Sequence, residues 1–130
     1  MFFIAAFVGL GSTAIKEPRK SGFKNLKVLP QDISEQKLDS IMHSYNIALN
    51  VDCKFCHAAP KANNLFPFNK ADSIDFASDA EPMKESARDM IRMNVYINKT
   101  YFYFDKNEKP EYLHTITCIT CHKGEPYPIH

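Results

Sequence analysis

The chain has 130 residues, a length typical of one domain, and 45% of them are hydrophobic. Its 16 Lys and Arg against 15 Asp and Glu give a formal net charge of +1, which argues against nucleic acid as a partner. Helical periodicity is clear in two long stretches, and the one strand candidate is short. We therefore predict a mainly α-helical fold with long loops.

Residues 1–14 have the pattern of a leader. An apolar run, Phe2 to Leu10, precedes Gly11-Ser12-Thr13-Ala14, as in the apolar region and cleavage site of a secretory signal. No Lys or Arg precedes the run, so a retained N-terminal anchor is the alternative. The run is shorter than the roughly 20 apolar residues of a membrane-spanning helix. We predict export to the periplasm, and a linker or wrapping segment at residues 15–31.

The first predicted helix follows Asp32. Asp32 is a good N-cap residue, and Glu35 stands three positions later, as in a capping box. The apolar residues that follow are Leu38, Ile41, Met42, Tyr45, Ala48 and Leu49. Their spacing is that of one buried helix face. Asn50 is expected to end the helix in a left-handed conformation.

A five-residue pattern, C-x-x-C-H, occurs twice and uses all four cysteines. Its residues are Cys53, Cys56, His57, Cys118, Cys121 and His122. By this pattern c-type haem is attached covalently. Two cysteines three positions apart lie on one side of a helical turn, where each can form a thioether with a haem vinyl group. The histidine that follows can bind the iron. We therefore predict two covalently bound haems c.

Three other uses of these cysteines fit the sequence less well. Zinc ribbons commonly place two C-x-x-C pairs about 15–20 residues apart, whereas 61 residues separate Cys56 from Cys118. A thioredoxin-like dithiol needs a βαβ context, which the sequence lacks. Two disulfides in an exported chain would leave His57 and His122 unexplained.

The second long helix is predicted from Ser78 or Asp79 to about Tyr101. Pro82 suits its first turn. The apolar residues broadly on one side of this helix are Met83, Ala87, Met90, Ile91, Ile97 and Tyr101, with Met93 at the edge.

Loops are expected at residues 58–78 and 102–117, and Gly124 is expected to end the helix of the second motif. Three phenylalanines of the first loop are expected either to cover a haem or to pack in the core. They are Phe66, Phe68 and Phe76.

The distal ligand of each iron decides what the protein can do. An iron with six protein ligands passes electrons, whereas an open iron binds small molecules. Met42 is the better candidate for the first haem, because it lies on the apolar helix face eleven residues before Cys53. Met90 and Met93 compete for the second haem. The outside candidates are His43, His114 and His130.

The chain resembles the photosynthetic reaction-centre cytochrome c subunit family over roughly residues 33–124. The matching stretches are Ile41-Met42, Ala48-Leu49-Asn50-Val51-Asp52-Cys53, Cys56-His57, Ile91-Arg92-Met93 and Cys121-His122-Lys123-Gly124. The family builds helix–turn–helix haem units in which a Met on the first helix is the sixth ligand. The resemblance therefore implies Met42 and Met93 as distal ligands. The family's full subunit carries four haems, whereas this chain has two motifs.

We predict that residues 32–130 form a dihaem cytochrome c domain, with two helix–turn–haem-helix units packed around two c-type haems. The expected iron ligands are His57 with Met42, and His122 with Met93. The predicted function is a periplasmic, or membrane-associated, electron-transfer relay rather than an enzyme. Its expected partners are redox proteins, such as a membrane respiratory or photosynthetic complex, and no substrate pocket is predicted. The alternative is a dihaem peroxidase or a haem-based small-ligand sensor with one open iron.

Overall fold

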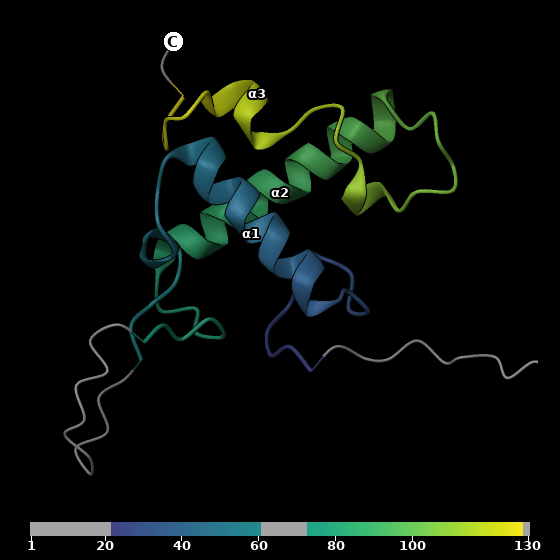
Figure 1. The fold of residues 1–130 in the computed structure, drawn as a ribbon. Coiled ribbons are helices and arrows are strands. Elements are labelled where there is room, and N and C mark those ends of the chain that lie inside the picture. Colours follow the sequence, from purple (N-terminus) through teal and green to yellow (C-terminus); the bar gives the residue numbers. More distant parts are fainter. Residues whose placement is uncertain (1–21, 61–72, 129–130) are drawn as a thin grey trace, which may run out of the picture.

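The structure is a computed structural model that describes residues 22–60 and 73–128 (Figure 1). The predicted leader lies outside these residues, as do Phe66, Phe68 and His130. The described elements are α1 (Glu35–Leu49), the 3₁₀ turn η1 (Cys53–Phe55), α2 (Pro82–Tyr101), the 3₁₀ turn η2 (Pro110–Tyr112) and α3 (Cys118–His122). The described part holds no strand, only an isolated antiparallel bridge between Ala58 and Asp75. The prediction of a mainly helical fold is confirmed.

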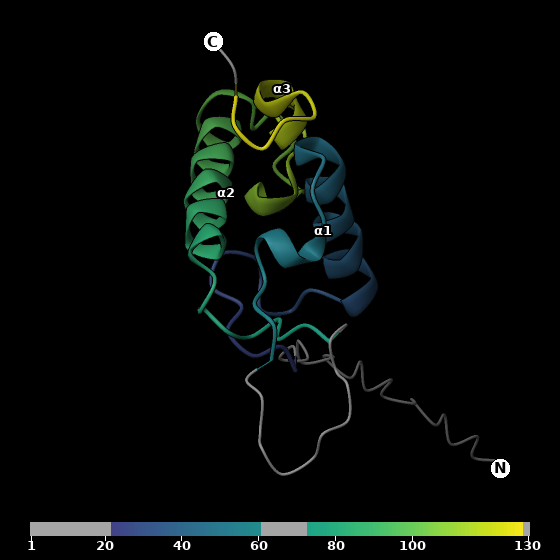
Figure 2. The ribbon, with the colours of Figure 1, turned by 90° about the vertical axis from the view of Figure 1, so that its left-hand side faces the viewer.

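The two long helices lie on opposite sides of the molecule. Figure 2 shows η1 and η2 between α1 and α2, with α3 across one end. The closest packing between elements is that of α3 on α1 and of η2 on α2. None of the helices in the described part is long and apolar enough to cross a membrane.

Helix α1 begins two residues later than the sequence predicted. Its N-cap is Ser34, whose hydroxyl accepts a hydrogen bond from the Lys37 backbone N–H at 3.2 Å. The prediction of Asp32 as N-cap is wrong, because the N–H of Ile33 bonds to the carbonyl of Pro30 at 3.2 Å and holds these residues in a turn. The C-terminal prediction is confirmed, since Asn50 is left-handed with φ 52° and ψ 47°.

A small apolar core lies on the inner side of α1. It is formed by Leu29 and Ile33 of the preceding segment together with Ile41 of α1, which are all buried. The partly buried side chains packed against it are Phe23, Leu26, Val28, Leu38, Met42, Tyr45 and Tyr112. The described end of residues 15–31 therefore contributes apolar side chains to the core.

Helix α2 has nearly the predicted position but a different inner face. It ends at Tyr101, as predicted, but it begins at Pro82 rather than at Ser78 or Asp79, because the Ser78 N–H bonds back to Asp75 in a turn. Its buried side chains are Lys84, Arg88 and Asn98, whereas Met90 is 47% exposed and Tyr101 64% exposed. The predicted apolar face is therefore wrong at these two positions. The physical reason is that the inner side of α2 meets backbone carbonyl and amide groups, which need polar partners.

Candidate functional site

The first C-x-x-C-H motif follows α1 directly. The Asp52 carboxylate accepts a hydrogen bond from the Lys54 N–H at 3.0 Å and starts a 3₁₀ turn, where the sequence predicted a helix. The His57 N–H then donates to the Cys53 carbonyl at 3.0 Å. The Asn46 amide of α1 lies 3.6 Å from the Cys53 sulfur. These contacts place the first thiol against the last turns of α1.

His57 has the properties of an imidazole that could bind a metal. Its Nδ1 atom is buried and has no hydrogen-bond partner among the described residues. Burial lowers the pKa of His57, and the nearby charges of Lys84 and Arg88 lower it further. The neutral form that this favours is the form that ligates iron. The Phe76 ring meets the His57 ring edge-on, with ring centroids 5.1 Å apart.

A cavity of about 260 Å³ lies beside this motif. Its lining residues are Lys54, His57, Ala58, Ala59, Ser73, Ile74 and Glu81. Three of these residues, Ser73, Ile74 and Glu81, belong to the segment that precedes α2. In this segment the Asp75 N–H bonds to the Ala58 carbonyl at 2.9 Å. A backbone hydrogen bond therefore ties this segment to the residue that follows the motif.

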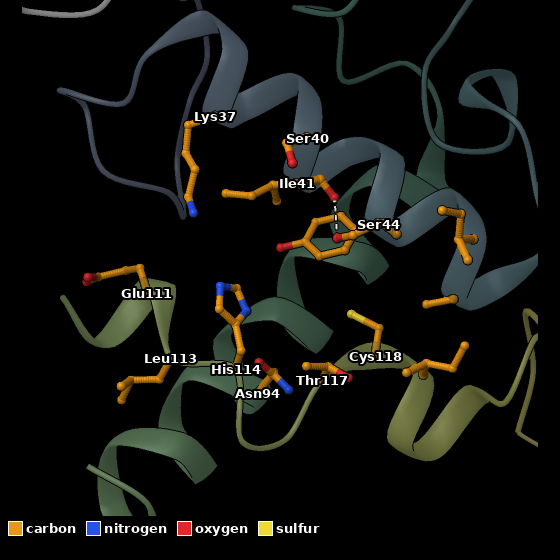
Figure 3. Close-up of a pocket in the computed structure, with 14 residues that line it drawn as sticks. Lys37, Ser40, Ile41, Ser44, Asn94, Glu111, Leu113, His114, Thr117 and Cys118 are labelled. Atoms are coloured by element: carbon orange, nitrogen blue, oxygen red, sulfur yellow. Dashed lines mark hydrogen bonds between the residues drawn. The ribbon is translucent and has the colours of Figure 1, made fainter. Parts of the chain in front are cut away.

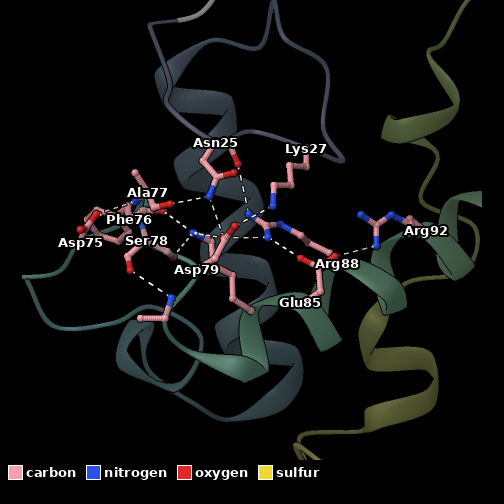
Figure 4. A network of polar contacts seen from close by, with 12 residues as sticks. Asn25, Lys27, Asp75, Phe76, Ala77, Ser78, Asp79, Glu85, Arg88 and Arg92 are labelled. Atoms are coloured by element: carbon pink, nitrogen blue, oxygen red, sulfur yellow. Dashed lines mark hydrogen bonds and ion pairs between the residues drawn. The ribbon is translucent and has the colours of Figure 1, made fainter.

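The segment before α2 is held by buried cations of α2. The Lys84 ammonium donates to the carbonyls of Phe76 at 2.9 Å and Ser78 at 2.6 Å. The Arg88 guanidinium pairs with Asp79 at 2.9 Å and with Glu85 at 2.6 Å (Figure 4).

Asp79 is the centre of this network. It also accepts hydrogen bonds from Lys27 at 2.7 Å and Asn25 at 2.8 Å. The bond from Lys27, followed by those from Asn25 and Arg88, holds the pKa of Asp79 well below its usual range. The network therefore joins residues 25–27, the segment before α2, and α2 itself.

The second motif forms α3 and lies against α1. Thr117 and Thr120 form a capping box that starts this helix. The left-handed residues Lys123, with φ 53°, and Gly124, with φ 91°, end it. The Gly124 N–H then bonds to the Ala48 carbonyl of α1 at 3.0 Å.

His122 is oriented by the chain that follows it. Its Nδ1 lies 2.9 Å from the Glu125 carbonyl oxygen. A carbonyl can only accept a hydrogen bond, so Nδ1 carries the proton and Nε2 is left with a free lone pair. This is the usual arrangement of a metal-binding histidine, in which a hydrogen bond at one ring nitrogen fixes the tautomer and the ring orientation.

A second cavity, of about 410 Å³, lies between α1 and residues 111–119. Figure 3 shows Lys37 of α1, and His114 and Cys118 of the opposite segment, pointing into the space between them. Burial, and then the neighbouring Cys121, raises the pKa of Cys118. Burial also raises the pKa of Tyr45, which lines the same cavity. The first cysteine of the second motif therefore faces the inner side of α1.

The candidate distal methionines line neither of these two cavities. Met42 is partly buried against the apolar core, while Met90 and Met93 are 47% and 48% exposed. Of the outside candidates, His114 lines the larger cavity, whereas the exposed His43 lies 3.8 Å from Asp39. The assignments of Met42 and Met93 stay predictions.

The donor set of the two motifs fits covalent haem. All four cysteines are free thiols. No three His, Cys, Asp or Glu residues within 22–60 and 73–128 come together as a metal-binding group, which is what the zinc alternative would need. Each motif instead offers two thiols and one imidazole within five residues, which is what two thioethers and one axial iron ligand require, and one donor of each motif, His57 or Cys118, lines a cavity.

Sequence reasoning missed the polar residues of α2. Lys84 and Arg88, four positions apart, hold the segment next to the first motif. Asn94 and Asn98, also four positions apart, both donate to the Ile116 carbonyl next to the second motif, at 2.9 and 2.7 Å. The i, i+4 spacing of these polar residues was the available signal, because it places each pair on one helix face.

Comparisons with known proteins agree with the motifs. A family model described as photosynthetic reaction centre cytochrome C subunit matches residues 11–130. A search of curated proteins and a search of solved structures found no match.

Proposed function

Because the chain belongs to the photosynthetic reaction centre cytochrome C subunit family, we propose that it carries electrons through two covalently bound haems c, one at each C-x-x-C-H motif. Membership itself implies a c-type cytochrome with covalent haem. The observation that supports the number two is that the complete C-x-x-C-H pattern occurs twice with four free thiols, and that each copy places one of these donors, His57 or Cys118, on the wall of a cavity.

In this proposal each motif binds one haem. Cys53 and Cys56 hold one haem, with His57 on its iron. The second haem is held by the other motif, through Cys118, Cys121 and His122. The bound haem supplies a reversible one-electron change between ferric and ferrous iron. The bond from His122 to the Glu125 carbonyl keeps that imidazole in one tautomer, and the buried, cation-flanked His57 stays neutral.

The distal ligands that we propose are Met42 and Met93, following the family resemblance. A thioether on each iron would close both haems to small molecules and favour the ferrous state. The protein would then be a relay that exchanges electrons with other redox proteins and has no substrate of its own. We propose a periplasmic location and a membrane complex as the redox partner, either a photosynthetic one, as the family's name suggests, or a respiratory one.

The rival function is a peroxidase or small-ligand sensor. Met93 is 48% exposed and lines neither cavity. If its sulfur does not reach the second iron, that iron is open on one side and can bind a peroxide or a gas. The two functions differ in a property that is simple to measure, which is the response of the mature protein to carbon monoxide and cyanide.

The test uses the full chain, matured in a host that attaches haem c. We expect an intact mass with two haems, colour that acid-acetone does not extract, and two low-spin haems unchanged by carbon monoxide or cyanide. The matched control replaces Cys118 and Cys121 with Ala and should carry one haem. A colourless product, or pigment that acid-acetone removes, would contradict the proposal. One high-spin haem that binds cyanide would favour the rival function.

A further inference from the structure

The Asn98 side chain is fully buried in α2, with 0% exposure. Its amide forms hydrogen bonds with both backbone groups of Ile116. Nδ2 donates to the Ile116 carbonyl at 2.7 Å, and Oδ1 accepts from the Ile116 N–H at 2.9 Å. Asn94 donates to the same carbonyl at 2.9 Å. Asn98 therefore pairs with Ile116 much as a residue of a neighbouring β-strand would.

Asn is an energetically unfavourable choice at a buried helical position, which indicates that Asn98 has a specific role. Asn is a poorer helix former than Leu, and a buried amide is unfavourable unless it is hydrogen-bonded. An apolar side chain of similar size could fill the same space in the interior. Unlike an apolar side chain, the amide can bind both backbone groups of Ile116. It thereby fixes where Ile116 lies along α2 and how its backbone is oriented.

Ile116 lies at the start of the second motif. Thr117 follows it as the N-cap of α3, and Cys118 is the first residue of that helix. A capping box fixes the orientation of a helix relative to its N-cap. The position of Ile116 on α2 therefore determines where Cys118 and His122 lie relative to α2.

We propose that Asn98 is the positioning residue of the second haem: its paired hydrogen bonds to Ile116 set the place of Cys118 and His122 on α2. The inference rests on the proposed function. Helix α2 also carries Met93, the proposed distal ligand, so the Asn98–Ile116 pair joins the two elements that would supply the axial ligands of one iron. Within residues 22–60 and 73–128, the side-chain hydrogen bonds of Asn98 go to Asn94 and Ile116 and none goes to the first motif.

The experiment replaces Asn98 with Leu, which has a similar branched shape and a higher helix propensity but removes both bonds to Ile116 and the contacts of the amide with Asn94. The matched control is Lys99→Leu at the exposed neighbouring position of α2. In mature Asn98→Leu, the amide hydrogen of Ile116 should exchange roughly tenfold faster, the equivalent of about 1.4 kcal/mol for the lost pair. The second haem should change its midpoint potential and begin to bind cyanide, whereas the first haem should keep both properties. Lys99→Leu should match the wild type.

The two haems act as internal references for each other. Equal changes at both would mean that Asn98 only supports the fold, and no change at the second would also overturn the proposal. If Asn98→Leu does not fold, Asn98→Asp keeps the acceptor for the Ile116 N–H, loses the donor, and should affect the second haem alone. If the wild type carries no haem at the second motif, the proposed function fails. The exchange rate of the Ile116 amide then still tests the contact itself.

Discussion

Replacing Lys84 with Met should loosen the first haem site and lower the stability of the fold. Lys84 is 8% exposed and donates to the carbonyls of Phe76 and Ser78 at 2.9 and 2.6 Å. These bonds hold the segment whose Phe76 ring meets His57. Methionine keeps an unbranched side chain of similar length, so the substitution removes the charge and both bonds while leaving most of the packing.

The size of the effect follows from the two bonds. A hydrogen bond to a charged group contributes about 1.5–3 kcal/mol, and the lower end applies because both bonds are only partly buried. Two such bonds, offset by the burial of the Met thioether, give a loss of about 2 kcal/mol. For a domain of this size each kcal/mol lowers the Tm by about 3–5 °C, so the expected drop is about 6–10 °C.

The assay is thermal unfolding of the mature protein followed by far-ultraviolet circular dichroism, together with a redox titration that resolves the two haems. The first haem should shift in potential and the second should not. Lys99→Met, at an exposed position of the same helix, is the control and should stay within about 0.5 kcal/mol of the wild type. An unchanged Tm together with an unchanged first haem would refute the role given to Lys84.

Three further predictions concern the ligands and the acid range. Met42→Ala should open one iron to cyanide, and an unchanged spectrum would exclude Met42 as a ligand. Met93→Ala should open the other iron and Met90→Ala should not; the reverse result would exchange their roles. The pKa of Asp79 is lowered by its bond from Lys27, so its contribution to stability is complete above the unfolded pKa of about 3.9 and is lost as the pH falls through the folded value. Asp79→Asn should therefore differ from the wild type by a constant free energy of unfolding above about pH 5, and this difference should shrink in stronger acid, as measured by urea denaturation.

The sequence predicted those features that depend on neighbours along the chain. The C-x-x-C-H motifs could be recognised because the spacing itself carries the chemistry. Asn50 and Pro82 marked helix ends because left-handed Asn and N-terminal Pro have local conformational causes. The start of α1 was misplaced, since it depends on a turn that buries Ile33 in the core.

Features that depend on distant segments were not predictable in the same way. Hydrophobic periodicity assigned Met90 and Tyr101 to the buried face of α2, but the interior there consists of backbone from other parts of the chain. Lys84 is buried because residues 76–78 fold back over it, and Asn98 because Ile116 does. The residues that flank Lys84 and Asn98 in the sequence do not indicate which distant segments these side chains contact. The packing of α3 on α1, across the whole of α2 in sequence, is of the same kind.

Lys84 and Asn98 lie near opposite ends of α2, and each contacts a segment next to a different C-x-x-C-H motif. Combining the two substitutions tests whether these contacts act independently. Asn98 is fourteen positions after Lys84, which is about 21 Å along the helix at 1.5 Å per residue. Sites so far apart with no shared partner normally contribute additively, within about 0.5 kcal/mol. In the variant carrying both Lys84→Met and Asn98→Leu, the loss in free energy of unfolding should therefore equal the sum of the losses in the two single variants. The midpoint potential of each haem should shift as it does in the corresponding single variant. A coupling larger than this would mean that α2 moves as one rigid body between the motifs, so that a change at one haem site is felt at the other.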